Sequence, residues 1–193
     1  TELLLEYDFG QIRYDQSSGS DSNYSQLLVG AIGNLTQKTT ATIKTGYQIR
    51  EYEGSDNHDY DAWVLYSDIV HEFSDKNAIK LSASRMPYES TYGVNNYYKA
   101  ENVTAIFDHF FTAKLIGFLT GEFQINSYPR ETTEGAETLN RKDKYYSAGA
   151  GFKYNLQKWI SLTLKFEHII RDSNFTIFDY DQNLVTFTAK AVF

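Results

Sequence analysis

Apolar and polar residues alternate along most of the chain. In 159–171, for example, Leu162 and Leu164 alternate with Thr163 and Lys165. A period of two places the two sets on opposite faces of a β-strand. Ten segments show this pattern, at about 2–14, 24–35, 40–52, 61–73, 78–89, 97–110, 114–127, 145–155, 159–171 and 183–193. The pattern predicts an all-β protein with about ten strands in one domain over residues 1–193.

The connections between these segments alternate in length. The short ones are "LTQKTT" (35–40), "FSDKNA" (73–78), "HFFTAK" (109–114) and "NLQKW" (155–159), and the others are longer and more polar. All short turns therefore fall at one end of the sheet. Short periplasmic turns and longer extracellular loops are typical of outer-membrane β-barrels, whose strands run antiparallel, up and down.

The short turns also share a lysine. These lysines are Lys38, Lys76, Lys114 and Lys158, at spacings of 38, 38 and 44 residues. A recurring spacing of this kind indicates an imperfect repeat of one β-hairpin.

A soluble β-sandwich or barrel would also alternate, with its apolar face turned inward. Three features favour a transmembrane barrel instead. The segments exceed the usual strand length of about five to six residues and are long enough to cross a bilayer at a tilt. Charged side chains in a dry core would each cost several kcal/mol. Aromatic residues gather near segment ends, as interfacial girdles require: Trp63, Tyr97, Tyr98, Phe110, Phe111, Tyr145, Tyr146 and Trp159.

The polar face is therefore predicted to line an aqueous lumen, and the apolar face to contact lipid. The parity of the segments identifies the lumen-lining candidates as Lys44, Gln48, Arg50, Asp68, Lys80, Glu122, Lys153, Lys165, Glu167 and Lys190. These residues are mixed in sign, with no arginine ladder that would indicate anion selectivity. They are equally consistent with a narrow lumen that salt-bridged side chains fill.

Composition narrows the possible functions. The net charge of −7 argues against nucleic acid as a partner, and the absence of cysteine excludes disulfides and thiolate chemistry. The chain begins at Thr1 without methionine, which we interpret as a mature or trimmed product.

Catalysis has one candidate region, the predicted outer loop "SDNHDYD" (55–61). It contains His58 with Asp56, Asp59 and Asp61, and the omptin proteases use Asp and His near the outer rim of a barrel. An acidic surface loop has the same composition, and no second carboxylate–histidine cluster faces this one. We therefore expect no enzyme activity, no cofactor and no metal site.

Two stretches resemble a known family. "LTQKTTATIKTGYQIREYE" (35–53) and the tail from Tyr154 to Phe193 are similar to the family called Putative beta-barrel porin 2, and "SASRMPYESTYGVNNYY" (82–98) extends the resemblance. The resemblance implies an outer-membrane barrel of a Gram-negative bacterium, associated with exopolysaccharide and periplasmic export proteins. It also implies longer relatives, so the chain would correspond either to the C-terminal part of a larger barrel or to a smaller relative.

The last segment carries a predicted assembly signal. "VTFTAKAVF" (185–193), with Phe187 and Phe193, resembles the signal by which the barrel-assembly machinery recognises a last strand. Pairing of this strand with the segment 2–14 would then remove both free edges of the sheet.

Two functions remain open at this stage. The first is a porin-like protein in the outer membrane that passes solutes or assists exopolysaccharide secretion. The second is a structural barrel that conducts nothing and anchors a partner complex. Strand number separates the two, because about eight strands give a filled interior and about 16 to 18 leave an aqueous channel.

Overall fold

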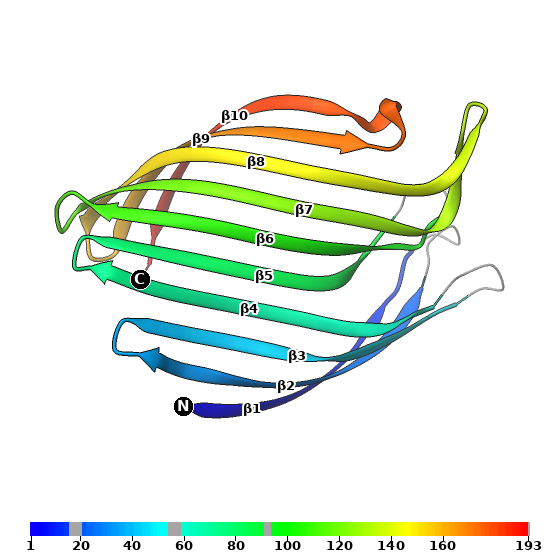
Figure 1. Ribbon diagram of the computed structural model, residues 1–193, viewed down its shortest axis with the longest axis horizontal. Helices are drawn as coiled ribbons and strands as arrows, with labels where there is room; N and C mark the ends of the chain where they lie inside the picture. The colour runs from blue at the N-terminus through cyan, green and yellow to red at the C-terminus, as the bar shows by residue number, and fades with distance from the viewer. Residues whose placement is uncertain (16–20, 54–58, 91–93, 193) are drawn as a thin grey trace.

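The computed structural model describes residues 1–15, 21–53, 59–90 and 94–192. Its strands are β1 (Glu2–Ile12), β2 (Ser22–Thr36), β3 (Thr39–Tyr52), β4 (Tyr60–Ser74), β5 (Asn77–Glu89), β6 (Tyr97–Phe110), β7 (Leu115–Glu134), β8 (Glu137–Gln157), β9 (Ile160–Ser173) and β10 (Tyr180–Ala191). They form one antiparallel sheet in sequence order, as Figure 1 shows. The predicted ten-stranded, up-and-down arrangement is confirmed.

One short helical turn interrupts the strands of the described residues, η1 (Thr176–Phe178) between β9 and β10. No helix in the described ranges has the length and apolar character needed to cross a membrane.

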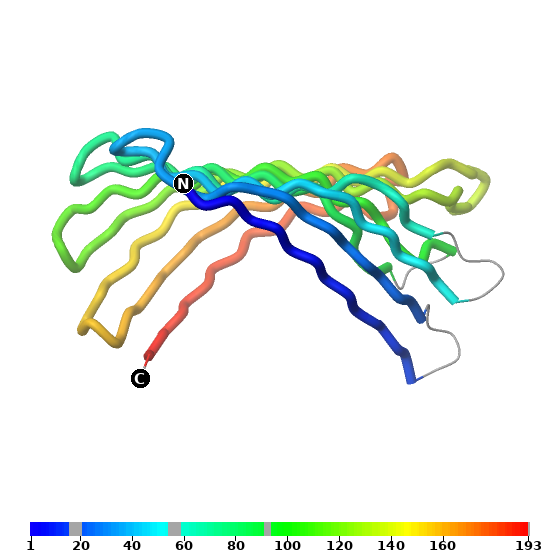
Figure 2. Tube along the Cα trace, turned by 90° about the horizontal axis from the view of Figure 1, so that it is seen from below, coloured from blue at the N-terminus to red at the C-terminus, as the bar shows by residue number. Residues whose placement is uncertain are grey.

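The sheet is open. Figure 2 shows it curved like an arch, with β1 and β10 at opposite edges. Within the described residues β1 pairs only with β2, and β10 pairs only with β9. The predicted closure of β10 onto β1 is therefore not present. A ten-stranded barrel that closes alone requires this pairing, because each of its strands must be hydrogen-bonded on both sides.

The strands are staggered as in a barrel wall. Following direct partners across the sheet from Thr39, the first residue of β3, leads to Val185, six residues before the end of β10 at Ala191. This shift accumulates over seven strand steps from β3 to β10. At about 3.4 Å per residue and 4.8 Å per strand, the stagger corresponds to a tilt of about 30°. Strands of outer-membrane barrels are tilted by a similar amount.

The predicted hairpin repeat recurs in the geometry of the short turns. A hydroxyl accepts a hydrogen bond from the backbone N–H of the lysine two residues later, at 3.2–3.3 Å, in Thr36–Lys38, Ser74–Lys76 and Thr112–Lys114. The carbonyl of the lysine then accepts the N–H of a residue in the next hairpin, at 2.8 Å: Glu72 for Lys38, Phe110 for Lys76 and Asn155 for Lys114. Each turn is thus bonded to its successor.

Side chains on the apolar face repeat with the same spacing. The His71 ring lies 2.8 Å from the Thr39 hydroxyl and 4.7 Å, between ring centroids, from Phe73. Thirty-eight residues later, His109 lies 2.8 Å from the Asn77 amide oxygen and 4.5 Å from the ring of Phe111. The Nδ1 atom of each histidine thus has a local hydrogen-bond partner at this end of the sheet.

The predicted long loop between residues 127 and 145 is instead an extension of the hairpin β7–β8. The turn of this hairpin contains Gly135 at φ 63°, a left-handed conformation that favours glycine. The extension was not predicted because "ETTEGAETL" is polar on both faces, so no apolar alternation marks it as a strand.

The pattern of burial is the reverse of that in a soluble protein, because polar side chains are buried and apolar side chains are exposed. Gln26, Gln48 and Arg50 on the polar face are only 5–7% exposed, whereas the adjacent apolar residues Leu27 and Ile49 are 51% and 45% exposed. Side chains converge on the concave face of a curved sheet and diverge on its convex face. The polar face is therefore the inner face of the arch.

A small core lies on this inner face near the long-loop end. Leu28 and Val64 are 2% and 0% exposed, and both are direct partners of Gly46. Tyr97 covers them by stacking on Tyr52 and by edge contact with Tyr60, at centroid distances of 5.8 and 5.4 Å. Because Gly46 has no side chain, the backbone of β2 at Leu27 and Leu28 can approach β3 closely beneath these tyrosines.

Replacing Leu164 by arginine should be much more destabilising than replacing Thr163. Leu164 is 51% exposed on the apolar face near the middle of β9, and Thr163 lies next to it on the polar face. Arginine in the middle of a bilayer costs about 2–4 kcal/mol, whereas in a wet interior it stays solvated. The measurement is the free energy of unfolding in phosphatidylcholine vesicles. Equal losses for the two variants would contradict the assignment of the faces.

Gly46→Ala should destabilise the sheet by about 1–3 kcal/mol, because its Cβ would overlap the Leu27 carbonyl oxygen. Gly121→Ala is the matched control, since a Cβ there has no neighbour within 4 Å among the described atoms. The same unfolding measurement compares the two variants. A Gly121→Ala loss as large as that of Gly46→Ala would show that close packing at Gly46 is unimportant.

Candidate functional site

The strand registers place all ten predicted lumen-lining residues on the polar face. Direct partners link Asp68 to Glu122, for example, through Ser82 on β5 and Thr104 on β6. The ten residues come from seven of the ten strands, so the polar face is a continuous surface across the sheet. Their role in lining a lumen stays a prediction, because the described strands enclose only part of a wall.

Polar side chains on β1 to β5 neutralise one another. Lys44 Nζ lies 2.7 Å from a Glu6 carboxylate oxygen, and Lys80 Nζ lies 3.2 Å from an Asp68 oxygen. Gln48 donates to Gln26 at 3.0 Å. Each of these contacts joins neighbouring strands or strands one apart, so the charges on this part of the face are held in place.

Carboxylates in the middle of the face accept bonds from uncharged groups as well as from cations. Glu167 accepts the Ser147 hydroxyl at 2.6 Å and the Lys165 ammonium at 2.7 Å. Glu122 accepts the side-chain amide of Asn102. The face therefore presents hydroxyls, amides and paired charges, which all can form hydrogen bonds with a hydrated solute.

A row of tyrosines and arginines crosses the polar face near the long-loop end, and we call it the aromatic belt. Its tyrosines are Tyr24, Tyr88, Tyr98, Tyr128, Tyr145 and Tyr180. Tyr98 stacks on Tyr88 and packs against Tyr128, at centroid distances of 5.7 and 5.4 Å. Guanidinium groups cover three of the rings at 4.6–4.8 Å: Arg50 over Tyr24, Arg141 over Tyr128 and Arg171 over Tyr180. Such cation–π contacts keep the rings and the arginines in fixed positions.

A buried ion pair anchors one end of the aromatic belt. Arg141 and Asp143 are 2.6 Å apart, and their side chains are 5% and 0% exposed. Asp143 also accepts the Ser173 hydroxyl at 2.7 Å, and the Phe178 ring lies 3.5 Å from the Arg141 guanidinium carbon. The sequence pattern did not reveal this pair, although Arg141, Asp143 and Tyr145 alternate with period two as a strand would require.

The predicted aromatic girdle is only partly found on the apolar face. Trp63 and Tyr146 are 50% and 43% exposed there, as expected. Tyr97 is 9% exposed in the small core, and Tyr98 and Tyr145 belong to the aromatic belt. Tyr98 and Tyr145 have the parity of the polar-face residues Asn102 and Ser147, whereas Tyr97 lies beyond the end of the β4–β5 ladder at Arg85.

The apolar face also carries a cluster of three charged side chains that the sequence pattern did not identify. Arg85 and Lys99 both pair with Glu101, at 3.1 and 3.2 Å, and the Arg85 guanidinium lies over the Trp63 ring. Mutual pairing and the aromatic cover reduce the cost of placing these charges beside an apolar band.

Other predicted residues have structural roles or lie outside the described ranges. The Asp59 carboxylate accepts the backbone N–H of Tyr52 at 2.9 Å, and Asp56 and His58 lie outside the described residues. Phe187 is 67% exposed on the apolar face, and Phe193 lies outside the described ranges. No group of histidine and acidic side chains in the described part of the chain could hold a metal ion.

A comparison with curated proteins found no match. The model of the family described as Putative beta-barrel porin 2 matches residues 2–193, which include every strand of the sheet. The tilted antiparallel wall, with its charged inner face and apolar outer face, agrees with that description. The chain belongs to the Putative beta-barrel porin 2 family.

Proposed function

We propose that the chain forms part of the wall of an outer-membrane channel. Its apolar face contacts lipid, and its polar face borders an aqueous path for hydrophilic solutes, with an exported polysaccharide as the principal candidate. The observation that supports this proposal is the reversed burial of the two faces, with Arg50 7% exposed and Leu27 51% exposed.

The two edges of the sheet, unpaired in the described part of the chain, favour a wide path over a filled interior. Side chains fill the interior when about eight strands close a barrel, whereas about 16 to 18 strands leave a channel. The ten strands do not meet edge to edge, so the arch corresponds to a wall of larger circumference that further strands complete.

The aromatic belt favours a glycan among hydrophilic solutes. Tyrosine rings present flat apolar faces with a hydroxyl at the tip, and the C–H faces of sugars stack on such rings. Amides and hydroxyls below the belt, such as Asn102 and Ser147, can exchange hydrogen bonds with sugar hydroxyls. The match to the porin family supports passage of a solute. An association with exopolysaccharide export is part of the proposal.

The same proposal implies three kinds of partner. The apolar face contacts outer-membrane lipid, and the last strand, with Phe187, contacts the barrel-assembly machinery during insertion. Periplasmic export proteins meet the short-turn end, if the solute is a secreted glycan.

Single-channel recording tests the function directly. The full chain, folded in detergent and inserted in a planar bilayer, should show steady conductance that large neutral polymers block, because copies of the chain can complete one wide, wet lumen. Silence from protein that is demonstrably folded would contradict a channel built from this chain alone, and would favour the non-conducting scaffold or a wall that other strands complete.

Cysteine labelling tests which face is wet. The chain has no cysteine, and Thr104 and Ala105 are neighbours on the polar and apolar faces of the central strand β6. A membrane-impermeant thiol reagent should label Thr104→Cys and leave Ala105→Cys unlabelled in outer membranes, because lipid covers the apolar face. Labelling of Ala105→Cys alone would reverse the two faces.

A further inference from the structure

Lysines form a column on the polar face of β8 to β10. Lys190 lies directly opposite Ser161 of β9, Lys153 lies opposite Thr163, and Lys165 follows on β9 itself. Projected onto β9, successive members are two residues, or about 7 Å, apart along the strand, and Lys190 and Lys153 also lie on either side of β9, about 10 Å apart across the sheet. The column therefore runs from the short-turn end to the middle of the face.

Two of these lysines have no carboxylate partner. Lys165 is paired with Glu167, whereas Lys153 and Lys190 form no ion pair with any carboxylate of the described residues. One carboxylate, Asp108 two strands away, interacts with Lys153 at longer range. On the other half of the face, by contrast, Lys44 and Lys80 are both paired.

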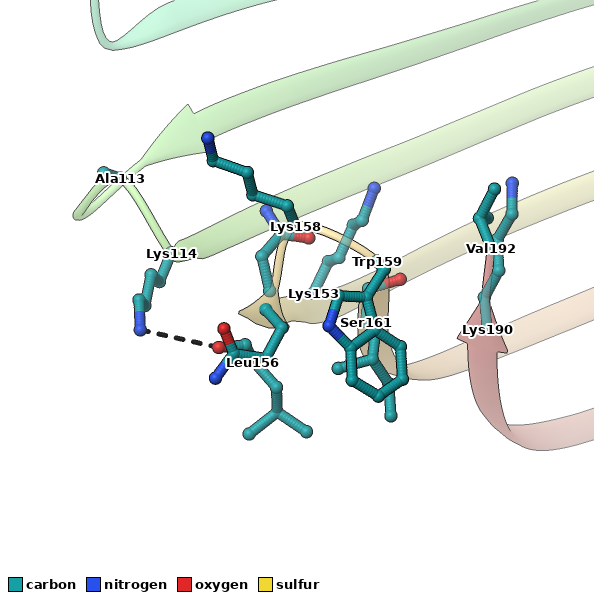
Figure 3. Close-up of a pocket in the computed structure, with 12 residues that line it drawn as sticks. Ala113, Lys114, Lys153, Leu156, Lys158, Trp159, Ser161, Lys190 and Val192 are labelled. Carbon is teal, nitrogen blue, oxygen red and sulfur yellow. Dashed lines mark hydrogen bonds between the residues drawn. The ribbon is translucent and has the colours of Figure 1, made fainter.

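The column begins at a hollow near the short turns. The hollow has a volume of about 710 Å³, and its described lining contains four lysines and no carboxylate. Figure 3 shows Lys153, Lys158 and Lys190 extending to the same side, while Lys114 bonds to the Leu156 carbonyl oxygen at 3.5 Å. This concentration of positive charge occurs in a protein whose net charge is −7.

The opposite part of the face carries no comparable excess of positive charge. Glu6 and Asp68 lie there on the same inner surface as the lysine column, but they are paired with Lys44 and Lys80. An excess of positive charge beside a neutralised sector attracts an anionic solute toward β8 to β10.

The arginines of the aromatic belt continue the positive sector. Arg171 lies on the same face of β9, opposite Tyr145 and Tyr180, and its guanidinium contacts both rings. Hydroxyls of Ser161 and Thr163 lie between the lysines of the column. Cations at regular intervals, with hydroxyls between them and aromatic rings at one end, match a polymer of sugars that bear carboxylates.

We propose that the β8–β10 sector is a binding path for an acidic glycan, whose carboxylates contact Lys190 and Lys153, the two lysines of the column that form no ion pair among the described residues. This inference rests on the proposed function and names the charge class of its solute. Lipid phosphates are a poorer match to the column, because its lysines lie on the face opposite to the lipid-facing one.

Calorimetric titration of the folded full chain in neutral detergent tests the proposal. The probes are oligogalacturonate and a neutral malto-oligosaccharide of equal length. Oligogalacturonate should bind more tightly, and its binding should weaken with added salt. The double variant Lys153→Gln/Lys190→Gln should weaken it by about fivefold, since each exposed ion pair contributes modestly.

The matched control is Lys44→Gln/Lys80→Gln, which removes the same number of charges from the paired half of the face. It should change oligogalacturonate binding by less than about twofold, because Glu6 and Asp68 already occupy those lysines. Equal losses in the two double variants would overturn the sector assignment, as would binding of the neutral oligosaccharide that is as tight as that of the acidic one.

The titration separates this inference from the channel itself. Steady conductance without preference for the acidic probe would leave the channel in place and overturn the acidic-glycan path. Selective, lysine-dependent binding by a chain that conducts nothing would support the binding path and contradict a channel built from this chain alone. If loss of Lys153 impairs folding, Lys158→Gln/Lys190→Gln provides the same test from two exposed positions.

Discussion

A strand in a bilayer must have its backbone N–H and C=O groups hydrogen-bonded within the protein, because lipid offers no partner for them. Eight of the ten strands meet this requirement on both sides, while β1 and β10 meet it on one side only in the described residues. The requirement explains the long antiparallel ladders and their uninterrupted order. It also means that the two edges of the arch, β1 and β10, need hydrogen-bonding partners. The number of strands that complete the wall then decides between a filled barrel and a channel.

Strand identity, turn direction and side-chain parity could be predicted from the sequence because each depends on local pattern. A period of two placed Lys44 and Lys190 on the same face although they lie at distant strands. Closure could not be predicted in this way, because curvature is a sum over the whole sheet. The β7–β8 extension and the Arg141–Asp143 pair were missed because polar residues on both faces leave no alternation of hydropathy. Parity also failed for Tyr97, since the β4–β5 ladder ends at Arg85 while β5 and β6 continue to pair.

The polar face combines two kinds of order. On β1 to β5, lysines and carboxylates are paired within the protein, so their charges largely neutralise each other. On β8 to β10, Lys153 and Lys190 form no ion pair with a described carboxylate and lie beside hydroxyls, and the aromatic belt lies at the long-loop end with its rings held by arginines. Charge segregation of this kind cannot be read from composition, because the total is negative and composition does not say which charges share a face.

The hydrogen bonds between the short turns of successive hairpins have a consequence for the circumference of the wall. At three of the four short turns the carbonyl of the lysine (Lys38, Lys76 or Lys114) accepts an N–H from the following hairpin, and the hydroxyl–lysine pattern recurs there with a spacing of 38 residues. A duplicated unit inserted between two others would find the same partners on both sides and would keep every side chain on its proper face. The circumference of the wall can therefore grow or shrink by whole hairpins, and pore width becomes a quantity that gene duplication alters in discrete steps.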